Sequence, residues 1–262
     1  MEVKTSSLKV KNKSRFLIKG INNAYANTIR RLITAETPVM AIDEVEIICN
    51  DSALYDEILA HRLGLVPFTT DLKSYVLKED CKCKGEGCAQ CTLKMTLKKS
   101  GPCNVYTSDI KTQDPKVKPV FPKMLLTKLL EGQNIEFIAI ARLGIGKEHA
   151  KFIPGLCFYQ GYPEFKIEKG KFENDVCAKV CPKKILVVKN KNLSVTDEEK
   201  CDLCGACHDC CPEFVQVHGS SEDFIFTIEP WGQLDEKEML VTAIEGFNKK
   251  LKSLADDIKD LK

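Results

Sequence analysis

A cysteine-rich segment in the last third of the chain constrains the fold more than any other feature. Between Cys201 and Pro212 the sequence is Cys-Asp-Leu-Cys-Gly-Ala-Cys-His-Asp-Cys-Cys-Pro. Its first three cysteines and the pair Cys211-Pro212 follow the spacing C-x2-C-x2-C-x3-C-P of bacterial ferredoxins, whose thiolates hold iron–sulfur clusters. A zinc knuckle is the alternative, but it usually presents two cysteine pairs separated by a longer spacer. The spacing therefore favours an iron–sulfur cluster.

The same spacing rule predicts the remaining ligand. In such a run the last cysteine, here Cys211, binds the other cluster of a two-cluster protein. The missing ligand then comes from a second Cys-Pro pair, which the chain has at Cys181 and Pro182. The predicted ligands of one [4Fe–4S] cluster are Cys181, Cys201, Cys204 and Cys207. An isolated preparation either keeps all four irons or holds the [3Fe–4S] form.

A second cluster is not expected. It would need cysteines three and six residues before Cys177, where the chain has Asn174 and Lys171. Three thiols are therefore spare, at positions 177, 210 and 211. They either include a disulfide pair or are simply buried sulfur.

Four further cysteines lie close together earlier in the chain, at Cys81, Cys83, Cys88 and Cys91. A Gly-Glu-Gly turn divides them, so the four thiolates can close a tetrahedral site. Apart from the cysteines, Ala89 is the only apolar residue of this loop, which therefore cannot order itself by burying surface. A structural zinc ion contributes on the order of 10–16 kcal/mol. We expect one Zn²⁺ here; the alternative is a flexible, reduced loop.

Composition limits the class of protein. The chain has 262 residues, 44% of them hydrophobic, which is enough for one large or several small globular domains. Its formal net charge of +2 argues against holding nucleic acid by bulk electrostatics. It has neither an apolar run of membrane-spanning length nor the apolar core of a signal peptide. We therefore expect a cytoplasmic protein without membrane contact, in which fourteen cysteines serve metal ligation before disulfides.

Hydrophobic periodicity predicts the main elements. Apolar residues at helical spacing from Ile21 to Ile33 predict a helix. Alternating apolar and polar residues predict short strands around Leu8 and Val10, at 16–18 and at 45–50. A helix is expected over 53–63, with Asp51 or Ser52 as its N-terminal cap and Gly64 at its C-terminal end. Segments 124–130 and 135–141 are interpreted as a hairpin.

The last element is a long helix from about residue 235. Its apolar residues alternate steps of four and three, which is a heptad seam. The seam residues are Leu240, Ile244, Phe247, Leu251, Leu254, Ile258 and Leu261. Burying them cannot offset the ordering of the helix without a partner. That partner is either the first helix of the same chain or a matching helix of a second chain.

No catalytic constellation is evident. Arg30 and Arg31 lie where a helix dipole favours cations, and Glu57 and His61 are an i,i+4 pair without a nucleophile. The two glycines of Gly144-Ile-Gly146 do not make a phosphate loop, because the Walker spacing and its Gly-Lys-Ser/Thr ending are missing. Whether the chain belongs to an enzyme stays open at this point.

Four segments carry a resemblance to a known family. Residues 22–33, 41–47, 56–67 and 144–154 resemble, in order, the signatures of the alpha-type assembly subunits of RNA polymerase. The cysteine loop at 81–91 is similar to that of the eukaryotic third-largest polymerase subunit. The ferredoxin-like insert is typical of the archaeal members of this family.

The resemblance implies an α+β fold with three parts. Residues 1–42 and 224–262 would form an alpha-type dimerisation domain. Residues 43–165 would be an inserted mixed α/β domain that carries the zinc loop. Residues 166–223 would be an inserted ferredoxin-like iron–sulfur domain.

It also implies a function and partners. The chain would be a non-catalytic assembly platform of DNA-directed RNA polymerase, a nucleotidyltransferase complex active in transcription, and would meet DNA only through that complex. It would form a heterodimer with the small subunit L through the heptad seam, and then bind subunit N and the second-largest subunit. The implied docking residues are Arg30, Arg31, Glu57, His61, Arg62, Lys147, His149 and Lys151. The alternative function is that of an iron–sulfur electron-transfer protein.

Overall fold

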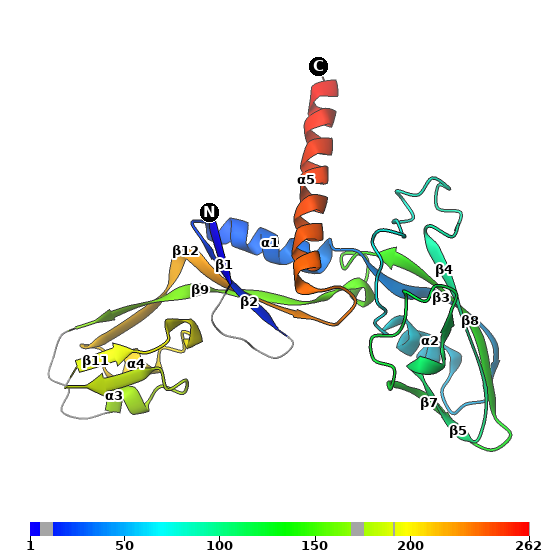
Figure 1. Ribbon diagram of the computed structural model, residues 1–262, viewed down its shortest axis with the longest axis horizontal. Helices are drawn as coiled ribbons and strands as arrows, with labels where there is room; N and C mark the ends of the chain where they lie inside the picture. Colours follow the sequence, from blue (N-terminus) through cyan, green and yellow to red (C-terminus); the bar gives the residue numbers. More distant parts are fainter. Residues whose placement is uncertain (6–12, 169–175, 191, 262) are drawn as a thin grey trace. The chain divides into compact units, whose positions relative to one another are not determined.

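The computed structural model describes residues 1–5, 13–168, 176–190 and 192–261. Contacts divide the chain into two compact units, which we call unit 1 (residues 1–30 with 157–229) and unit 2 (residues 31–156 with 230–262). Each is described by itself, with the elements labelled as in Figure 1. Both units are built from sheets with few helices, so the fold is mixed α/β.

A four-stranded sheet is the frame of unit 1. Its order is β1 (Glu2–Thr5), β2 (Ser14–Lys19), β12 (Val215–Pro230) and β9 (Gly155–Ile167). Phe16 and Phe226 are opposite each other in the register of β2 and β12, and their rings stack at 5.5 Å between centroids. Strand β2 confirms the strand expected at 16–18, whereas the one expected around Leu8 and Val10 lies outside the described residues.

The helix predicted after β2 is α1 (Asn23–Ala35). The Asn22 side chain caps its first turn, because Oδ1 accepts a hydrogen bond of 2.9 Å from the backbone N–H of Tyr25. Ile21, Ile29 and Ile33 of the expected apolar stripe are buried. Tyr25, which belongs to the same stripe, is 46% exposed.

A small cysteine-rich layer completes unit 1. It consists of α3 (Val176–Lys179), the antiparallel hairpin of β10 (Leu186–Lys189) and β11 (Asn192–Val195), the 3-10 turn η3 (Glu198–Lys200) and α4 (Ala206–Cys210). Ile185, Leu186, Leu193 and Val215 form its apolar core together with buried cysteines. Cysteine side chains therefore make up a large part of the buried core of this layer.

Unit 2 is built on a second four-stranded sheet. Its order is β3 (Val39–Asn50), β8 (Asn134–Gly144), β4 (Thr92–Ser100) and β6 (Lys111–Thr112); a separate pair joins β5 (Cys103–Tyr106) to β7 (Leu125–Leu129). Its core includes Phe68, Phe137 and Leu63, all nearly inaccessible. Unit 2 also contains two 3-10 turns, η1 (Thr107–Asp109) between β5 and β6 and η2 (Ala150–Phe152) after β8.

The hairpin predicted for residues 124–141 is wrong. Both segments are strands, β7 and β8, but they pair with different partners: β7 with β5, and β8 with β3 and β4. The turn between them fits a hairpin, but long-range pairing decides which strands meet. Adjacency in the sequence does not give that information.

Helix α2 (Asp56–Gly64) begins later than predicted. The Asn50 side chain donates to the carbonyl oxygen of Leu54 (2.9 Å) and to Asp56 (2.8 Å), and Ser52 Oγ accepts from the N–H of Leu54. These bonds hold residues 51–55 in a turn, so neither Asp51 nor Ser52 caps the helix. Its expected C-terminal glycine, Gly64, is instead the last helical residue.

The long C-terminal helix is α5 (Glu236–Asp260). Asp235 caps it, because its carboxylate accepts a 2.6 Å hydrogen bond from the N–H of Glu238. Met239 and Ala243 are the buried residues of this helix. Among the described residues, no helix is long and apolar enough to cross a membrane.

The heptad seam is a different face of α5 from the buried one. Ile244, Leu251, Leu254 and Ile258 are 42%, 48%, 55% and 56% exposed, and Leu261 just beyond the helix is 85% exposed. Leu240 and Phe247 are half-buried. Within the described part of this chain the seam is therefore open.

Candidate metal centres

The loop 81–91 brings four sulfur atoms together. The Sγ atom of Cys81 lies 3.4 Å from that of Cys83 and 3.5 Å from that of Cys88, and Cys91 Sγ lies 3.5 Å from Cys83 and 3.9 Å from Cys88. Thiolates held 2.3 Å from one tetrahedral ion would be about 3.8 Å apart. The donor set and its spacing therefore fit a single metal ion.

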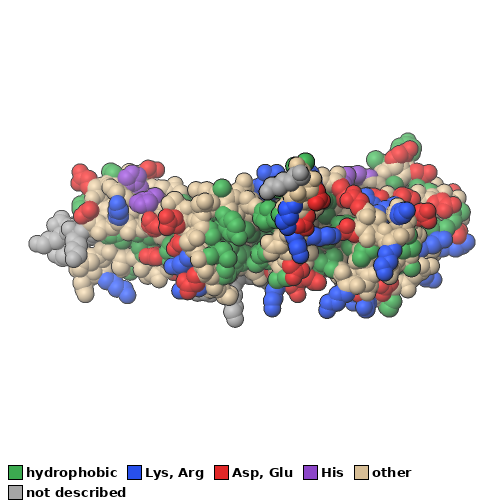
Figure 2. Space-filling model, turned by 90° about the horizontal axis from the view of Figure 1, so that it is seen from above, with side chains coloured by type: hydrophobic (Ala, Val, Ile, Leu, Met, Phe, Trp, Pro, Cys, Tyr) green, Lys and Arg blue, Asp and Glu red, His purple; other side chains and the backbone are tan. Residues whose placement is uncertain are grey.

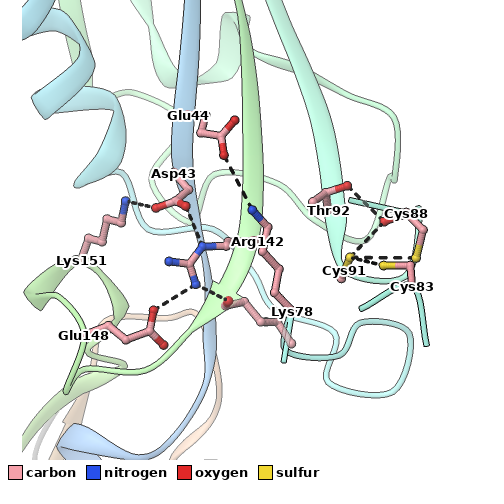
Figure 3. A network of polar contacts seen from close by, with 11 residues as sticks. Asp43, Glu44, Lys78, Cys83, Cys88, Cys91, Thr92, Arg142, Glu148 and Lys151 are labelled. Carbon is pink, nitrogen blue, oxygen red and sulfur yellow. Dashed lines mark hydrogen bonds and ion pairs between the residues drawn. The ribbon is translucent and has the colours of Figure 1, made fainter. Parts of the chain in front are cut away.

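The backbone of this loop is shaped for convergence. Lys84, Gly85 and Gly87 have positive φ angles of 54°, 87° and 97°, which turn the chain back within a few residues. After the turn, Thr92 donates from its hydroxyl to the carbonyl oxygen of Cys88 at 3.1 Å, next to the sulfur group (Figure 3). The loop is thereby attached to the start of β4.

Hydrogen bonding changes the acidity of these thiols. A hydrogen bond with the backbone N–H of Cys88, and then the hydrogen bond between the thiols of Cys83 and Cys81, lowers the pKa of Cys83 to about 5. A lowered pKa favours the thiolate, which is the form in which cysteine binds metal.

The second cysteine set surrounds a cavity in unit 1. The cavity measures about 10 Å³ and is lined by all four predicted cluster ligands, Cys181, Cys201, Cys204 and Cys207. Phe165, Ile185 and Val217 supply an apolar wall. Among the described residues, only the loop 81–91 gathers three or more potential metal-ligand atoms within 4.8 Å of one another. The four cysteines of the second set thus line one common cavity without converging on a single point.

Local backbone geometry supports this second site. Gly205 (φ 78°) and Leu203 (φ 56°) both adopt left-handed conformations within the run. The N–H of Leu203 donates to Cys201 Sγ at 3.4 Å, the kind of bond that supports a cluster thiolate. Burial raises the pKa values of Cys201 and Cys207.

Two of the three spare cysteines form a disulfide. Cys177 and Cys211 are bonded, across 34 residues of sequence, while Cys210 is a free and exposed thiol. The open alternatives of disulfide and buried sulfur are thus resolved in favour of the disulfide. Lys171 and Asn174, which replace the other ligands of a second cluster, lie outside the described residues.

The predicted docking residues differ in how free they are. On α2, Glu57, His61 and Arg62 are exposed, and the Arg62 guanidinium donates to the carbonyl oxygen of Leu125 at 2.7 Å. Arg30 is half-buried and donates twice to Asn27. The exposed residues of the remaining set are Arg31, Lys147 and His149.

Lys151 is turned inward. Its side chain is only 14% exposed, and Nζ lies 2.7 Å from Asp43 Oδ1. The other carboxylate oxygen of Asp43 lies 2.6 Å from Arg142 Nε, and Arg142 also pairs with Glu148 at 3.0 Å (Figure 3). This geometry favours an internal role for Lys151 over the docking role expected from the resemblance.

The Asp43 ion-pair network is a site that sequence reasoning missed. Burial raises the pKa of Asp43, but hydrogen bonds from Arg142 and Lys151 outweigh that effect and bring it below its usual value. Both cations lie over the ring of Phe152, at 4.9 and 5.0 Å from its centroid. A Cβ atom at Gly144 would meet that ring at 2.6 Å, so this glycine serves close packing. The sequence signal that could have indicated this site is the segment in which Gly144 and Gly146 are followed by the charged residues Lys147, Glu148 and Lys151.

Charge on the visible surface is mixed. Figure 2 shows lysine and arginine side chains interspersed with aspartate and glutamate, without a large area of one sign. This distribution agrees with the near-zero net charge. It does not favour bulk electrostatic binding of nucleic acid.

Comparison with known proteins defines the class and then the family. The family model of the RNA polymerase Rpb3/RpoA insert domain matches residues 42–154 of this chain. The DNA-directed RNA polymerase subunit Rpo3 of Methanosphaera stadtmanae is 34% identical over 257 residues, covering 94% of each chain. The Rpo3 subunit of Methanosarcina acetivorans is 33% identical, and the match covers 98% of this chain and 100% of the relative. The Rpo3 subunit of Pyrococcus furiosus is 34% identical, and the match covers 94% of this chain and 93% of the relative. The chain belongs to the family of the DNA-directed RNA polymerase subunit Rpo3.

Proposed function

We propose that this chain is a non-catalytic assembly subunit of DNA-directed RNA polymerase. The observation that carries the proposal is its similarity to Rpo3 subunits over nearly its whole length. The same role accounts for the exposed apolar surface of the described part of α5. The alternative of an electron-transfer protein is not favoured by these relatives.

The partners follow from the open seam of α5. Ile244, Leu251, Leu254 and Ile258 present apolar surface that a helix of heptad pattern would cover. We assign this face to a heterodimer with the small alpha-like subunit L. Subunit N and the second-largest subunit would then dock on surfaces that include Glu57, His61 and Arg62 on α2.

The domain organisation is part of the proposal. Residues 1–42 and 224–262 would form the dimerisation domain, 43–165 the inserted domain, and 166–223 the ferredoxin-like domain. The match of the insert-domain family to residues 42–154 supports the proposed bounds of the inserted domain, 43–165. We also propose that the protein is located in the cytoplasm.

We assign Zn²⁺ to the loop 81–91 and one [4Fe–4S] cluster to the second cysteine set. Zinc suits the first site because four thiolates converge within bonding distance of a single ion. A cluster suits the second because its cysteines have ferredoxin spacing and line a cavity. Holding the cysteine layer folded is the role that such a cluster would have in an assembly subunit.

The test is co-purification of the tagged full chain with polymerase subunits. Leu251→Asp with Leu254→Asp should abolish recovery of the small partner, because charge enters the dimer seam. Lys252→Asp, an exposed change on the same helix, should leave it unchanged. Equal recovery from both variants would contradict the seam assignment. A monomer that exchanges electrons with a reductase and binds no polymerase subunit would favour the alternative function.

A further inference from the structure

Three polar side chains connect the cysteine layer to the sheet of unit 1. Gln160 on β9 donates from Nε2 to the carbonyl oxygen of Cys201 at 2.8 Å. Two strand positions on, the Tyr162 hydroxyl donates to Glu198 Oε2 at 2.9 Å. From β2, Arg15 Nη2 donates to the carbonyl oxygen of Glu199 at 3.1 Å.

All three contacts reach one short segment. They end on residues 198–201, which lead directly into the first predicted cluster ligand of the run, Cys201. The Gln160 bond acts on the backbone of that ligand itself and is partly buried. These side chains therefore hold the entry of the cysteine run, and they come from two strands of the same sheet.

Apolar packing adds a fourth contact. A Cβ atom at Gly219 of β12 would lie 3.1 Å from Leu203 Cδ1, so the glycine leaves room for Leu203 against the sheet. Leu203 sits between two predicted ligands in a left-handed conformation, which is unfavourable for a side-chain-bearing residue. Seating its side chain on β12 helps to hold that conformation. The loop is thus fixed to β2, β9 and β12.

We propose that Gln160 and Tyr162, with Arg15, are positioning residues that fasten the cysteine loop 198–204 to the sheet, so that cluster occupancy and sheet order stabilise each other. The inference rests on the proposed iron–sulfur centre and adds how that centre acts on the rest of unit 1. Coupling of this kind is reciprocal. A sheet that stabilises the cluster must itself be more ordered when the cluster is bound.

Gln160→Met is the main test, because it keeps the length of the side chain and removes the donor to Cys201. Loss of one such hydrogen bond changes the equilibrium constant between bound and released cluster about fivefold. We expect anaerobic full-chain protein to release iron to a ferrous chelator about fivefold faster than wild type. Gln216→Met, the same change at an exposed position of β12, is the matched control.

Tyr162→Phe and Tyr159→Phe form a second matched pair on β9. The first removes the hydroxyl bonded to Glu198; the second removes a hydroxyl from a ring packed on Phe224 and Phe226. Only the first should speed iron release. Arg15 is not used, because its Nε atom is buried without a hydrogen-bond partner among the described residues, so replacing it also removes an unfavourable group.

Hydrogen exchange gives the second readout. In wild type, cluster removal should speed amide exchange in β2 and in β9 as well as in the loop 198–204. In Gln160→Met, the response of the two strands should shrink relative to Gln216→Met. Equal iron release and equal strand responses in both variants would overturn the inference while leaving the cluster in place. Absence of iron and sulfide from anaerobically purified wild type would instead refute the proposed cluster.

Discussion

At the scale of single residues, Asp43 is a charged residue that forms partly buried ion pairs, which its neighbours in the sequence do not predict. Its carboxylate accepts from Arg142 and from Lys151, and the three side chains are only 14–23% exposed. Each cation also lies on the ring of Phe152. The group therefore joins β3, β8 and the η2 turn, because one carboxylate is shared between two cations and both are packed on one ring.

We expect Asp43→Asn to lower the stability of unit 2 by about 2 kcal/mol at neutral pH, between the values for exposed and buried pairs, because two half-buried cations lose their anion. Amide exchange in β3 and β8 measures this change. Lys98→Met, which breaks an exposed pair with Glu136, is the control and should cost less than about 0.5 kcal/mol.

The pH dependence of the same variant tests the role of charge. The pKa of Asp43 is lowered in the folded chain, so the unfolded state binds its proton first as the pH falls. The stabilisation is complete above the unfolded value of about 3.9 and is lost as the pH falls through the folded value. The difference between wild type and Asp43→Asn should therefore shrink toward zero in acid. A difference that stays constant with pH would mean that packing, and not charge, is responsible.

At the scale of elements, the loop 81–91 is the segment that we expect to depend most on the proposed metal ion. It buries two cysteines and few other apolar groups, and its turns need positive φ angles at Lys84, Gly85 and Gly87. Ordering such a segment costs about 1–2 kcal/mol per residue in backbone entropy. Sulfur–metal bonds are the available compensation.

Removal of zinc should therefore open this loop to trypsin. Lys82 and Lys84 lie between the cysteines and supply cleavage sites. Cys88→Ser should lose zinc and be cut there at least tenfold faster than wild type. Cys103→Ser, at a free cysteine outside the loop, should keep its zinc and its resistance. Mass spectrometry of the fragments identifies the cut, and resistance of the metal-free loop would contradict the expectation.

At the scale of the whole molecule, the two candidate metal centres belong to separate compact units. The loop 81–91 lies in unit 2, and the ferredoxin-type cysteines lie in unit 1. The proposed roles of the two centres differ accordingly: one orders an exposed loop, the other holds a small layer against a sheet. Sites without shared partners respond independently to mutation.

Each centre should therefore survive the loss of the other. Cys201→Ser should lose iron and sulfide while retaining one zinc per chain, and Cys88→Ser should show the reverse. Metal analysis of anaerobically purified full-length variants measures both. Loss of both metals from either variant would mean that the two units fold as one.

Much of the candidate site could be predicted from local sequence. The two-residue gaps of the run 201–207 and the Gly-Glu-Gly turn of the loop 81–91 act over a few residues. The structure gathers the four sulfurs of the loop 81–91, and the cysteines of the second set line one cavity. Helices α1 and α5 were likewise predictable, because apolar periodicity is a property of contiguous residues.

Only the tertiary structure decided the long-range pairings. The disulfide between Cys177 and Cys211 spans 34 residues, Lys151 reaches Asp43 over 108, and β7 and β8 belong to different sheets. Nothing in the neighbouring residues specifies these choices, because they depend on which surfaces meet once the core has formed. The sequence by itself determined which groups could bind metal, cap a helix or form a seam. Folding determined which of them face each other and which, like the α5 seam, are left for a partner.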